Sequence, residues 1–312
     1  MKYLFGPINS RRLGISLGID LVPPKTCTLD CVYCECGRTT NLTSKIKEYY
    51  PTSAIIQEID NYLNSKPKLD VITLAGSGEP TLHQGIGQII NYLKTNHPSY
   101  KVALLTNGTL LYLNEVQNKI KLVDYLIPSL DAVSQNVFQK ILRPAPGMES
   151  KKIINGLIDL QKKLAGQIIL EIFIIPQIND KPQELKKLKE ACRKIKPTKI
   201  QLNSLDRPGT EDWVKPENKK NLLKIKEYFL PLKVEIIGQP SPKNQSKTEQ
   251  NSIETKISSI LKRRPSTIDD LMANLNLRKI ELIKIIQEMI AKDEIKTKKE
   301  ERGTFYFYKN NN

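Results

Sequence analysis

The sequence predicts an α/β fold followed by a small, mostly helical domain. Between residues 15 and 238, short β-branched runs alternate with amphipathic stretches, a pattern typical of parallel strands joined by right-handed crossovers. The stretch 239–252 is rich in Pro, Ser, Asn and Gln and indicates a linker. We therefore expect two domains, residues 1–238 and 253–312, joined by that linker.

Strands and helices of the first domain follow from the spacing of apolar residues. In one predicted helix, Leu157, Leu160 and Leu164 fall three to four residues apart, as one buried helix face requires. Six strand–helix units fit a partial (β/α)6 or full barrel, and a doubly wound sheet is the alternative. The expected strands are 15–22, 71–75, 102–106, 125–130, 168–175 and 199–204, with 234–238 at an edge, and the expected helices are 54–63, 85–96, 149–164, 183–194 and 217–229.

The second domain is expected to contain three helices and a hairpin. A first helix begins near Ile253, and Thr267 with Asp270 makes a start like a capping box for a second, short helix. A third spans 277–292, and the segment 294–309 contains two strands around a glycine turn. Three helices followed by a hairpin are typical of a winged helix.

Composition indicates a protein of the cytoplasm. No run of about eighteen apolar residues is present, which argues against a membrane span. The N-terminal residues lack the apolar core and small-residue cleavage site of a signal peptide. The net charge of +16, from 49 Lys and Arg against 33 Asp and Glu, could steer the protein toward a polyanion. A lysine-rich proteome would give the same balance.

Four of the five cysteines, Cys27, Cys31, Cys34 and Cys36, lie within ten residues, and only Cys192 is distant. A disulfide framework needs pairs spread along the chain, whereas a tight cluster more often binds metal. Three thiolates on one loop can bind three irons of a cubane and leave the fourth iron open. A zinc site completed by Cys36 is the alternative. Cys192 lies in a helical pattern and is expected in the core.

This Cys-x3-Cys-x2-Cys spacing, with Tyr33 before the third cysteine, resembles the radical S-adenosylmethionine (SAM) superfamily over about residues 6–238. The resemblance implies a radical SAM enzyme with a [4Fe–4S] cluster on Cys27, Cys31 and Cys34, whose open iron binds the SAM amino and carboxylate groups. One electron from a flavodoxin or ferredoxin would cleave SAM into methionine and a 5′-deoxyadenosyl radical, which abstracts hydrogen from the substrate.

The resemblance also implies where SAM binds. The turn AGSGEP follows the strand 71–75, where the superfamily has a Gly-Gly-Glu-like turn that binds the SAM amino group, and glycine allows close backbone approach. Polar groups at the carboxyl ends of barrel strands converge on the active face. Glu171 is the best of the later candidates, since an apolar strand rarely carries a buried Glu without a partner. The expected SAM contacts are Gly76, Gly78, Glu79, Thr106, Asn107, Ser129, Asp131, Glu171 and Asn203.

The segments GPINSRRLGISLGIDLVPPKTCTLDCVYC and GSGEPTLH are similar to a group related to the tRNA wyosine base synthases. Those synthases carry additional cysteines before the radical loop, and none precedes Cys27 here. We therefore carry over the fold and the SAM chemistry, and not the product.

The substrate stays open between two classes, RNA such as tRNA and a protein or small molecule. For RNA, basic residues on the third helix and the hairpin could meet phosphates; for a protein or small molecule, the winged helix would be a docking module. An iron–sulfur regulator that binds DNA is a third reading. The basic residues are Arg278, Lys279, Lys284, Lys296, Lys298, Lys299 and Arg302.

Overall fold

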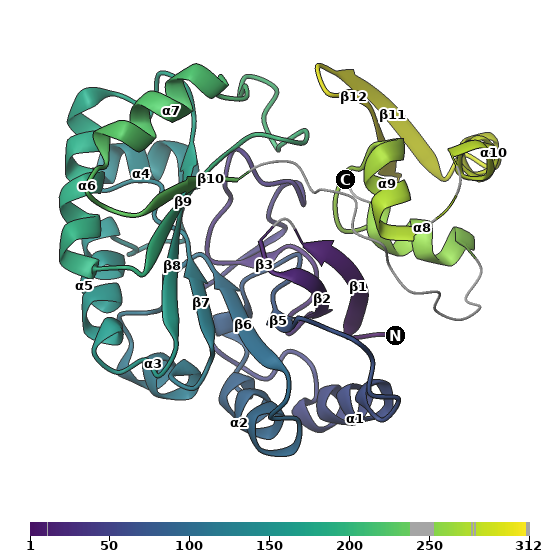
Figure 1. Cartoon of the computed structure of the whole chain (residues 1–312), viewed down its shortest axis with the longest axis horizontal. Coiled ribbons are helices and arrows are strands. Elements are labelled where there is room, and N and C mark those ends of the chain that lie inside the picture. The colour runs from purple at the N-terminus through teal and green to yellow at the C-terminus, as the bar shows by residue number, and fades with distance from the viewer. Residues whose placement is uncertain (11, 238–252, 276, 278, 310–312) are drawn as a thin grey trace.

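The structure, a computed structural model, describes residues 1–10, 12–237, 253–275, 277 and 279–309. Its largest element is an eight-stranded sheet in the order β1-β2-β5-β6-β7-β8-β9-β10 (Figure 1). All neighbouring pairs from β2 to β10 are parallel, and β1 is antiparallel to β2. The expected α/β class with a mostly parallel sheet is confirmed. The strands are β1 (Leu4–Ser10), β2 (Gly14–Ile19), β5 (Val71–Leu74), β6 (Lys101–Thr106), β7 (Tyr125–Pro128), β8 (Gln167–Ile174), β9 (Lys199–Ser204) and β10 (Val234–Ile236).

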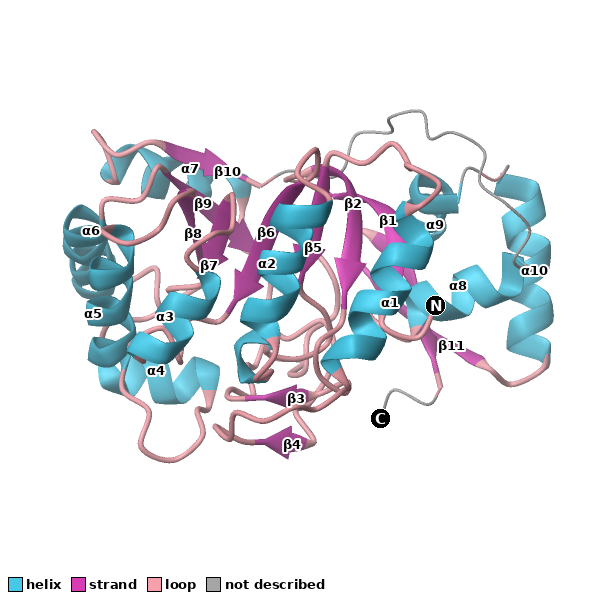
Figure 2. Cartoon of the chain, turned by 90° about the horizontal axis from the view of Figure 1, so that it is seen from below, coloured by secondary structure: helices cyan, strands magenta, loops and turns pink. Residues whose placement is uncertain are grey.

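Seven helices of this part lie along the outer face of the sheet (Figures 1 and 2). Helix α6 illustrates why they form: Pro182 occupies its first turn, Lys196 ends it in the left-handed conformation, and its apolar face is buried. Cys192 lies on that face and is fully buried, as expected. The helices are α1 (Thr52–Leu63), α2 (Ile86–Asn96), α3 (Asn114–Ile120), α4 (Gln135–Leu142), α5 (Ser150–Gln161), α6 (Pro182–Ile195) and α7 (Lys219–Tyr228), with a short 3-10 helix at Pro80–Leu82.

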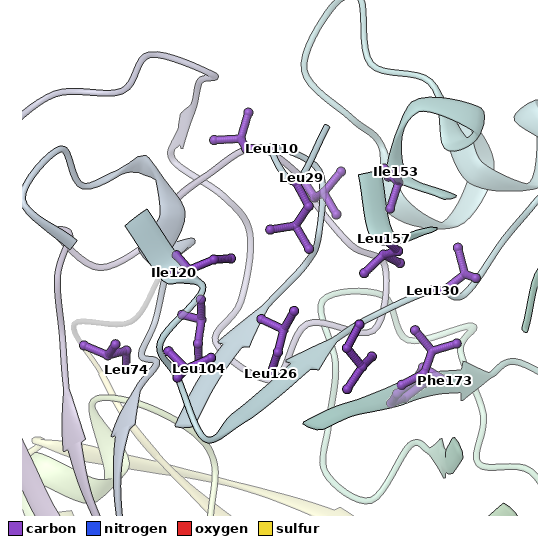
Figure 3. Packing of buried hydrophobic residues seen from close by; sticks show 14 of the residues in the cluster. Leu29, Leu74, Leu104, Leu110, Ile120, Leu126, Leu130, Ile153, Leu157 and Phe173 are labelled. Carbon is purple, nitrogen blue, oxygen red and sulfur yellow. The ribbon is translucent and has the colours of Figure 1, made fainter. Parts of the chain in front are cut away.

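The two faces of the sheet differ in chemistry. Leu104 and Leu126 point to the outer face and are fully buried with Ile120 of α3 and Leu157 of α5 in the core (Figure 3). Successive strand residues point to alternate faces of the sheet. Polar side chains lie on the opposite, inner face. There the hydroxyls of Ser16 and Thr73 hydrogen-bond at 2.7 Å, and Glu171 aligns in register with Gln201. The inner face therefore presents side chains that can form hydrogen bonds with a polar ligand.

An ion pair shows that the sheet is curved. Arg12, at the turn between β1 and β2, pairs with Glu171 on β8. Strands β1 and β8 are five strand spacings apart in the sheet order, which would be about 24 Å in a flat sheet. No arginine side chain spans that distance, so the strands must curl around the polar face.

Some elements differ from the expectation. Strand β1 was missed because the segment LFGPINS contains Gly6 and Pro7, which break a strand pattern, and its register shifts between Phe5 and Ile8. Helices α3 and α4 span only seven and eight residues, too short for a helical period to stand out. The expected strand 15–22 ends at Ile19, because the chain turns there into the cysteine loop.

The C-terminal part contains the expected three helices and hairpin in the expected order. Its helices pack around a separate cluster that includes Ile257, Leu271 and Ile286. The capping box is confirmed: the Asp270 N–H donates to Thr267 Oγ1 at 3.2 Å, and the Thr267 N–H donates to Asp270 Oδ2 at 3.1 Å. The linker 239–252 and Arg278 lie outside the described residues. The elements are α8 (Ile253–Leu261), α9 (Ile268–Leu275), α10 (Lys279–Ala291) and the antiparallel strands β11 (Ile295–Glu300) and β12 (Gly303–Tyr308).

Within the described ranges, every helix is too short or too polar to cross a membrane.

Candidate active site

The cysteine loop, residues 20–51, follows β2 and is fixed by main-chain hydrogen bonds. The Cys34 N–H donates to the Cys31 carbonyl at 3.1 Å and forms a tight turn. The Val32 N–H donates to Ile141 O at 2.9 Å, which ties the loop to the end of α4. Cys27 belongs to a two-residue strand, β3 (Thr26–Cys27), paired with β4 (Asn41–Leu42). The loop therefore presents its thiols from a defined backbone.

All four cysteines of this loop are free and partly exposed. Burial raises the pKa of the Cys27 thiol to about 12, and the Glu79 carboxylate adds to the effect. Burial also raises the pKa of Cys31, with the neighbouring Cys27 contributing. A metal must therefore displace the thiol protons when it binds.

The donor set fits a cubane with an open iron. A structural zinc needs four ligands around one ion, whereas a [4Fe–4S] cubane takes each thiolate on a different iron and so spreads its ligands. Three free thiols on one anchored loop, Cys27, Cys31 and Cys34, offer one thiolate to each of three irons of a cubane.

The glycine turn after β5 lies directly against the cysteine loop. The Lys25 N–H donates to Ser77 O at 2.6 Å, and the Glu79 N–H donates to Thr26 O at 3.0 Å. Gly76 has a φ of +142°, and a Cβ there would clash with the Asp20 carboxylate; a Cβ on Gly78 would clash with the Thr26 carbonyl. The glycines are needed for this close approach. Their contact with SAM stays a prediction.

Glu79 connects the ends of β5 and β6. The carboxylate is 2% exposed, and Oε1 accepts hydrogen bonds from the Thr81 N–H at 3.0 Å, the Thr81 hydroxyl at 2.6 Å and the Thr106 hydroxyl at 2.7 Å. Oε2 accepts from the Asn107 N–H at 2.8 Å. Burial raises the pKa of Glu79, and these hydrogen bonds oppose the shift. The Glu79 side chain thus holds two strand ends together.

Asp131 clamps the aromatic residue of the cysteine motif. Its Oδ1 accepts from the Phe173 N–H at 2.7 Å, and its Oδ2 accepts from the Tyr33 hydroxyl. The Tyr33 ring stacks on Phe173 with centroids 3.9 Å apart. Burial raises the pKa of Asp131 to about 7. Cys34, the third cysteine of the motif, follows Tyr33 directly, so these contacts of Tyr33 also restrain the position of Cys34.

Three predicted SAM residues share one small pocket beside the cysteine loop. Asn107, Ser129 and Asp131 line a cavity of about 30 Å³ together with Leu29 and Tyr33 of that loop. The structure therefore brings together residues from the ends of β6 and β7, and their contact with SAM stays a prediction.

Glu171 has a partner that the sequence analysis missed. Its carboxylate pairs with Arg12, and both side chains are more than four-fifths buried. Asn203 Nδ2 donates to Glu171 Oε1 at 3.3 Å. The sequence did indicate that Glu171 needs a cation, since a carboxylate in an apolar strand is costly to bury alone. It did not indicate that this cation is Arg12. Glu171 and Asn203 therefore lie together on the inner face.

We expect Arg12→Met to lower the free energy of unfolding by on the order of 3 kcal/mol, because it leaves the Glu171 carboxylate buried without a counter-charge. The double variant Arg12→Met/Glu171→Gln should recover part of that loss. Urea denaturation of the four proteins of this cycle measures both values. Additive effects of the two substitutions would show that the pair does not interact.

A largely buried charge cluster joins the C-terminal part, residues 253–309, to the cysteine loop. Arg207, in the loop after β9, is 3% exposed. Its guanidinium lies 3.2 Å from Glu35 of the cysteine loop, 3.6 Å from Asp206 and 3.4 Å from Asp270 of α9. Arg302 of the hairpin turn pairs with the same two aspartates, Asp206 and Asp270. Carboxylates from three segments thus surround the buried Arg207, and the partly buried Arg302 pairs with two of them.

A second contact between the C-terminal part and the rest of the molecule lies beside the glycine turn. Arg263, after α8, pairs with Asp20 at the end of β2, and its guanidinium lies 4.0 Å from the centroid of the Phe5 ring. Asp20 is the residue that Gly76 approaches. The sequence predicted a separate domain on a linker and gave no sign that it packs against the site loops.

A family model for the radical SAM superfamily matches residues 21–189. A UPF0026 protein of Methanocaldococcus jannaschii is 30% identical over 318 residues, which cover 99% of this chain and 97% of that protein. A protein of Brachyspira hyodysenteriae named GTPase Obg is 34% identical over 298 residues, 95% of this chain. This chain spans only 43% of the length of the Brachyspira protein.

Solved structures show the same fold at low identity. A radical SAM methyltransferase from Sphaerobacter thermophilus superposes with a TM-score of 0.54 at 14% identity and covers 71% of this chain and 65% of that one. TYW1 with a lysine–pyruvate adduct bound gives a TM-score of 0.54 at 19% identity, with 72% of this chain and 75% of that one covered.

Proposed function

The chain belongs to the radical SAM superfamily and is an enzyme of that class, and from this premise we propose that it starts radical chemistry on RNA, with tRNA as the substrate class. We propose further that Cys27, Cys31 and Cys34 hold the [4Fe–4S] cluster, that the curved sheet is a partial (β/α)6 barrel, and that the C-terminal domain is a winged helix. An external flavodoxin or ferredoxin would supply electrons in the cytoplasm.

One observation carries the SAM chemistry: three free thiols stand on a loop whose backbone is hydrogen-bonded to the glycine turn. When bound, the cluster supplies the electron that cleaves a sulfur–carbon bond of SAM and so yields methionine and a 5′-deoxyadenosyl radical. The chain's own residues position the ligands and exclude water. The inner face, with Glu171, Gln201 and Asn203, would bind the polar parts of SAM or substrate.

Anaerobic reconstitution with iron and sulfide, followed by SAM and dithionite, tests this class of chemistry. We expect release of 5′-deoxyadenosine, measured by liquid chromatography. A protein that holds a cubane, is reduced by dithionite and releases none would refute the proposed SAM cleavage.

The RNA part of the proposal rests on the resemblance to the wyosine-related group and on three lysines. Lys279 and Lys284 of α10 and Lys299 of β11 are exposed and could contact phosphates. The synthases proper carry additional cysteines before the radical loop, and none precedes Cys27 in this sequence. We therefore propose no product.

We expect charge reversal at these three lysines, Lys279→Glu/Lys284→Glu/Lys299→Glu, to weaken tRNA binding at least about tenfold at moderate salt, because phosphate contacts are lost. Fluorescence anisotropy with labelled tRNA measures the dissociation constant. Point substitutions are preferable to deletion of the domain, since deletion would remove the partners of Arg207 and Asp20.

The matched control is Lys219→Glu/Lys220→Glu/Lys224→Glu on α7, which makes the same charge change on exposed lysines outside the C-terminal domain. Equal affinities of the two triple variants would contradict a role of the C-terminal domain in RNA delivery.

A second candidate, radical modification of a protein or small molecule with the C-terminal domain as a docking module, has one observation in its favour. On α10, Ile280 is 72% exposed and Ile290 is 38% exposed, and a protein partner bound there would remove this apolar surface from water. In that case the lysine variant would bind tRNA as the wild type does, and Ile280→Glu would impair substrate turnover.

A further inference from the structure

Asn107 reaches from the sheet to the cysteine loop. The residue follows β6, and its N–H donates to Glu79 Oε2 at 2.8 Å, which fixes its backbone. Its side-chain Nδ2 donates to Thr28 Oγ1 at 2.7 Å and lies 3.4 Å from Cys27 Sγ within hydrogen-bond geometry. The amide thus touches the first cysteine of the motif and the residue that follows it.

The orientation of this amide is determined by its neighbours. Oδ1 accepts from the Thr109 N–H at 3.0 Å and from the Thr109 hydroxyl at 2.7 Å. A main-chain N–H can only donate, so the oxygen of the amide must face Thr109 and the NH2 group must face Cys27. The two hydrogens of that NH2 group serve Thr28 and Cys27. All four hydrogen-bonding positions of the Asn107 amide are then in use.

We infer that Asn107 is a positioning residue for the cluster, donating a hydrogen bond to the Cys27 sulfur and thereby raising the reduction potential. The inference rests on the proposed function. Hydrogen bonds to ligating sulfurs set the potentials of iron–sulfur clusters, because a donor stabilises the reduced, more negative state. Polar groups around metal ligands also orient them. Because its side-chain amide is fully hydrogen-bonded to Cys27, Thr28 and Thr109, Asn107 has no side-chain group left to bind SAM.

The test is the midpoint potential of the reconstituted cluster, from a redox titration followed by electron paramagnetic resonance (EPR). In Asn107→Leu, which lacks the donor, we expect a shift to more negative potential. In Asn107→Asp, which keeps the size of the side chain but turns a carboxylate oxygen toward the sulfur, we expect a larger shift in the same direction. Since electron transfer from the donor becomes less favourable, 5′-deoxyadenosine release should slow in parallel.

Thr109→Val is the matched control. It removes the hydroxyl from the same buried cluster but keeps the Thr109 N–H that orients the amide, so we expect the wild-type midpoint. A merely structural role of Asn107 would instead give Thr109→Val and Asn107→Leu similar behaviour.

The inference is overturned if both Asn107 variants carry full iron content and titrate at the wild-type midpoint. Should Asn107→Leu fail to fold, the nearly isosteric Asn107→Asp decides alone. A wild-type protein without any cubane would refute the proposed function as well, whereas an unchanged midpoint refutes only the role of Asn107.

Discussion

Replacing Cys31 with alanine is expected to remove the cluster and to abolish 5′-deoxyadenosine release. The substitution leaves two of the three proposed ligands, and the loop that presents them is held by main-chain hydrogen bonds. Those bonds prevent the backbone from moving another donor into the place of Cys31. Iron and sulfide content after anaerobic reconstitution, together with 5′-deoxyadenosine release, measures the loss.

Cys36→Ala is the matched control, because Cys36 lies on the same loop but outside the Cys-x3-Cys-x2-Cys spacing. We expect this variant to retain the cluster and to release 5′-deoxyadenosine at the wild-type rate. Loss of the metal from Cys36→Ala as well as from Cys31→Ala would indicate a site with four cysteine ligands, and would contradict the open cubane.

The second large effect is expected at Glu79. Glu79→Ala removes the acceptor of four hydrogen bonds, leaving the donors of Thr81 and Thr106 buried and the N–H of Asn107 partly buried. We expect the free energy of unfolding to fall by on the order of 3–5 kcal/mol, since hydrogen bonds to charged groups are strong and unsatisfied donors are costly. Urea denaturation of the protein without cluster or SAM measures this value.

Thr81→Val, which loses only one hydroxyl bond to Glu79, should cost about 1 kcal/mol. The comparison separates two roles of the glutamate. If Glu79 acted only as a SAM contact, Glu79→Ala would leave the stability of the ligand-free protein unchanged and would weaken only SAM binding.

Local signals made much of this fold predictable. The run VITL, and IILEIFI apart from Glu171, are buried on both faces of the sheet, and so their apolar character is evident in the sequence. The cysteine motif and the glycine turn are contiguous in sequence, and the structure joins them through backbone hydrogen bonds at Lys25 and Glu79. Their proximity follows from parallel neighbouring strands, whose carboxyl ends meet at one edge.

Contacts between distant segments were not predictable. The pair Arg12–Glu171 exists only because the sheet curls. The sequence around either residue does not indicate that the other is its partner. The same holds for Arg207 and Asp270. A polar linker suggested an independent C-terminal domain, and the buried charges that attach it to the site loops come from tertiary packing. For Asn107, the sequence indicated a polar group near the site, and only the structure showed its amide directed at Cys27.

The central claim is that three thiolates leave one iron free to bind SAM, and EPR of the reduced, reconstituted protein with and without SAM tests it most directly. We expect a [4Fe–4S]⁺ signal that changes on addition of SAM, because the amino and carboxylate groups would coordinate the open iron. A protein that reconstitutes with zinc alone, or a cubane signal that stays the same at saturating SAM, would contradict it.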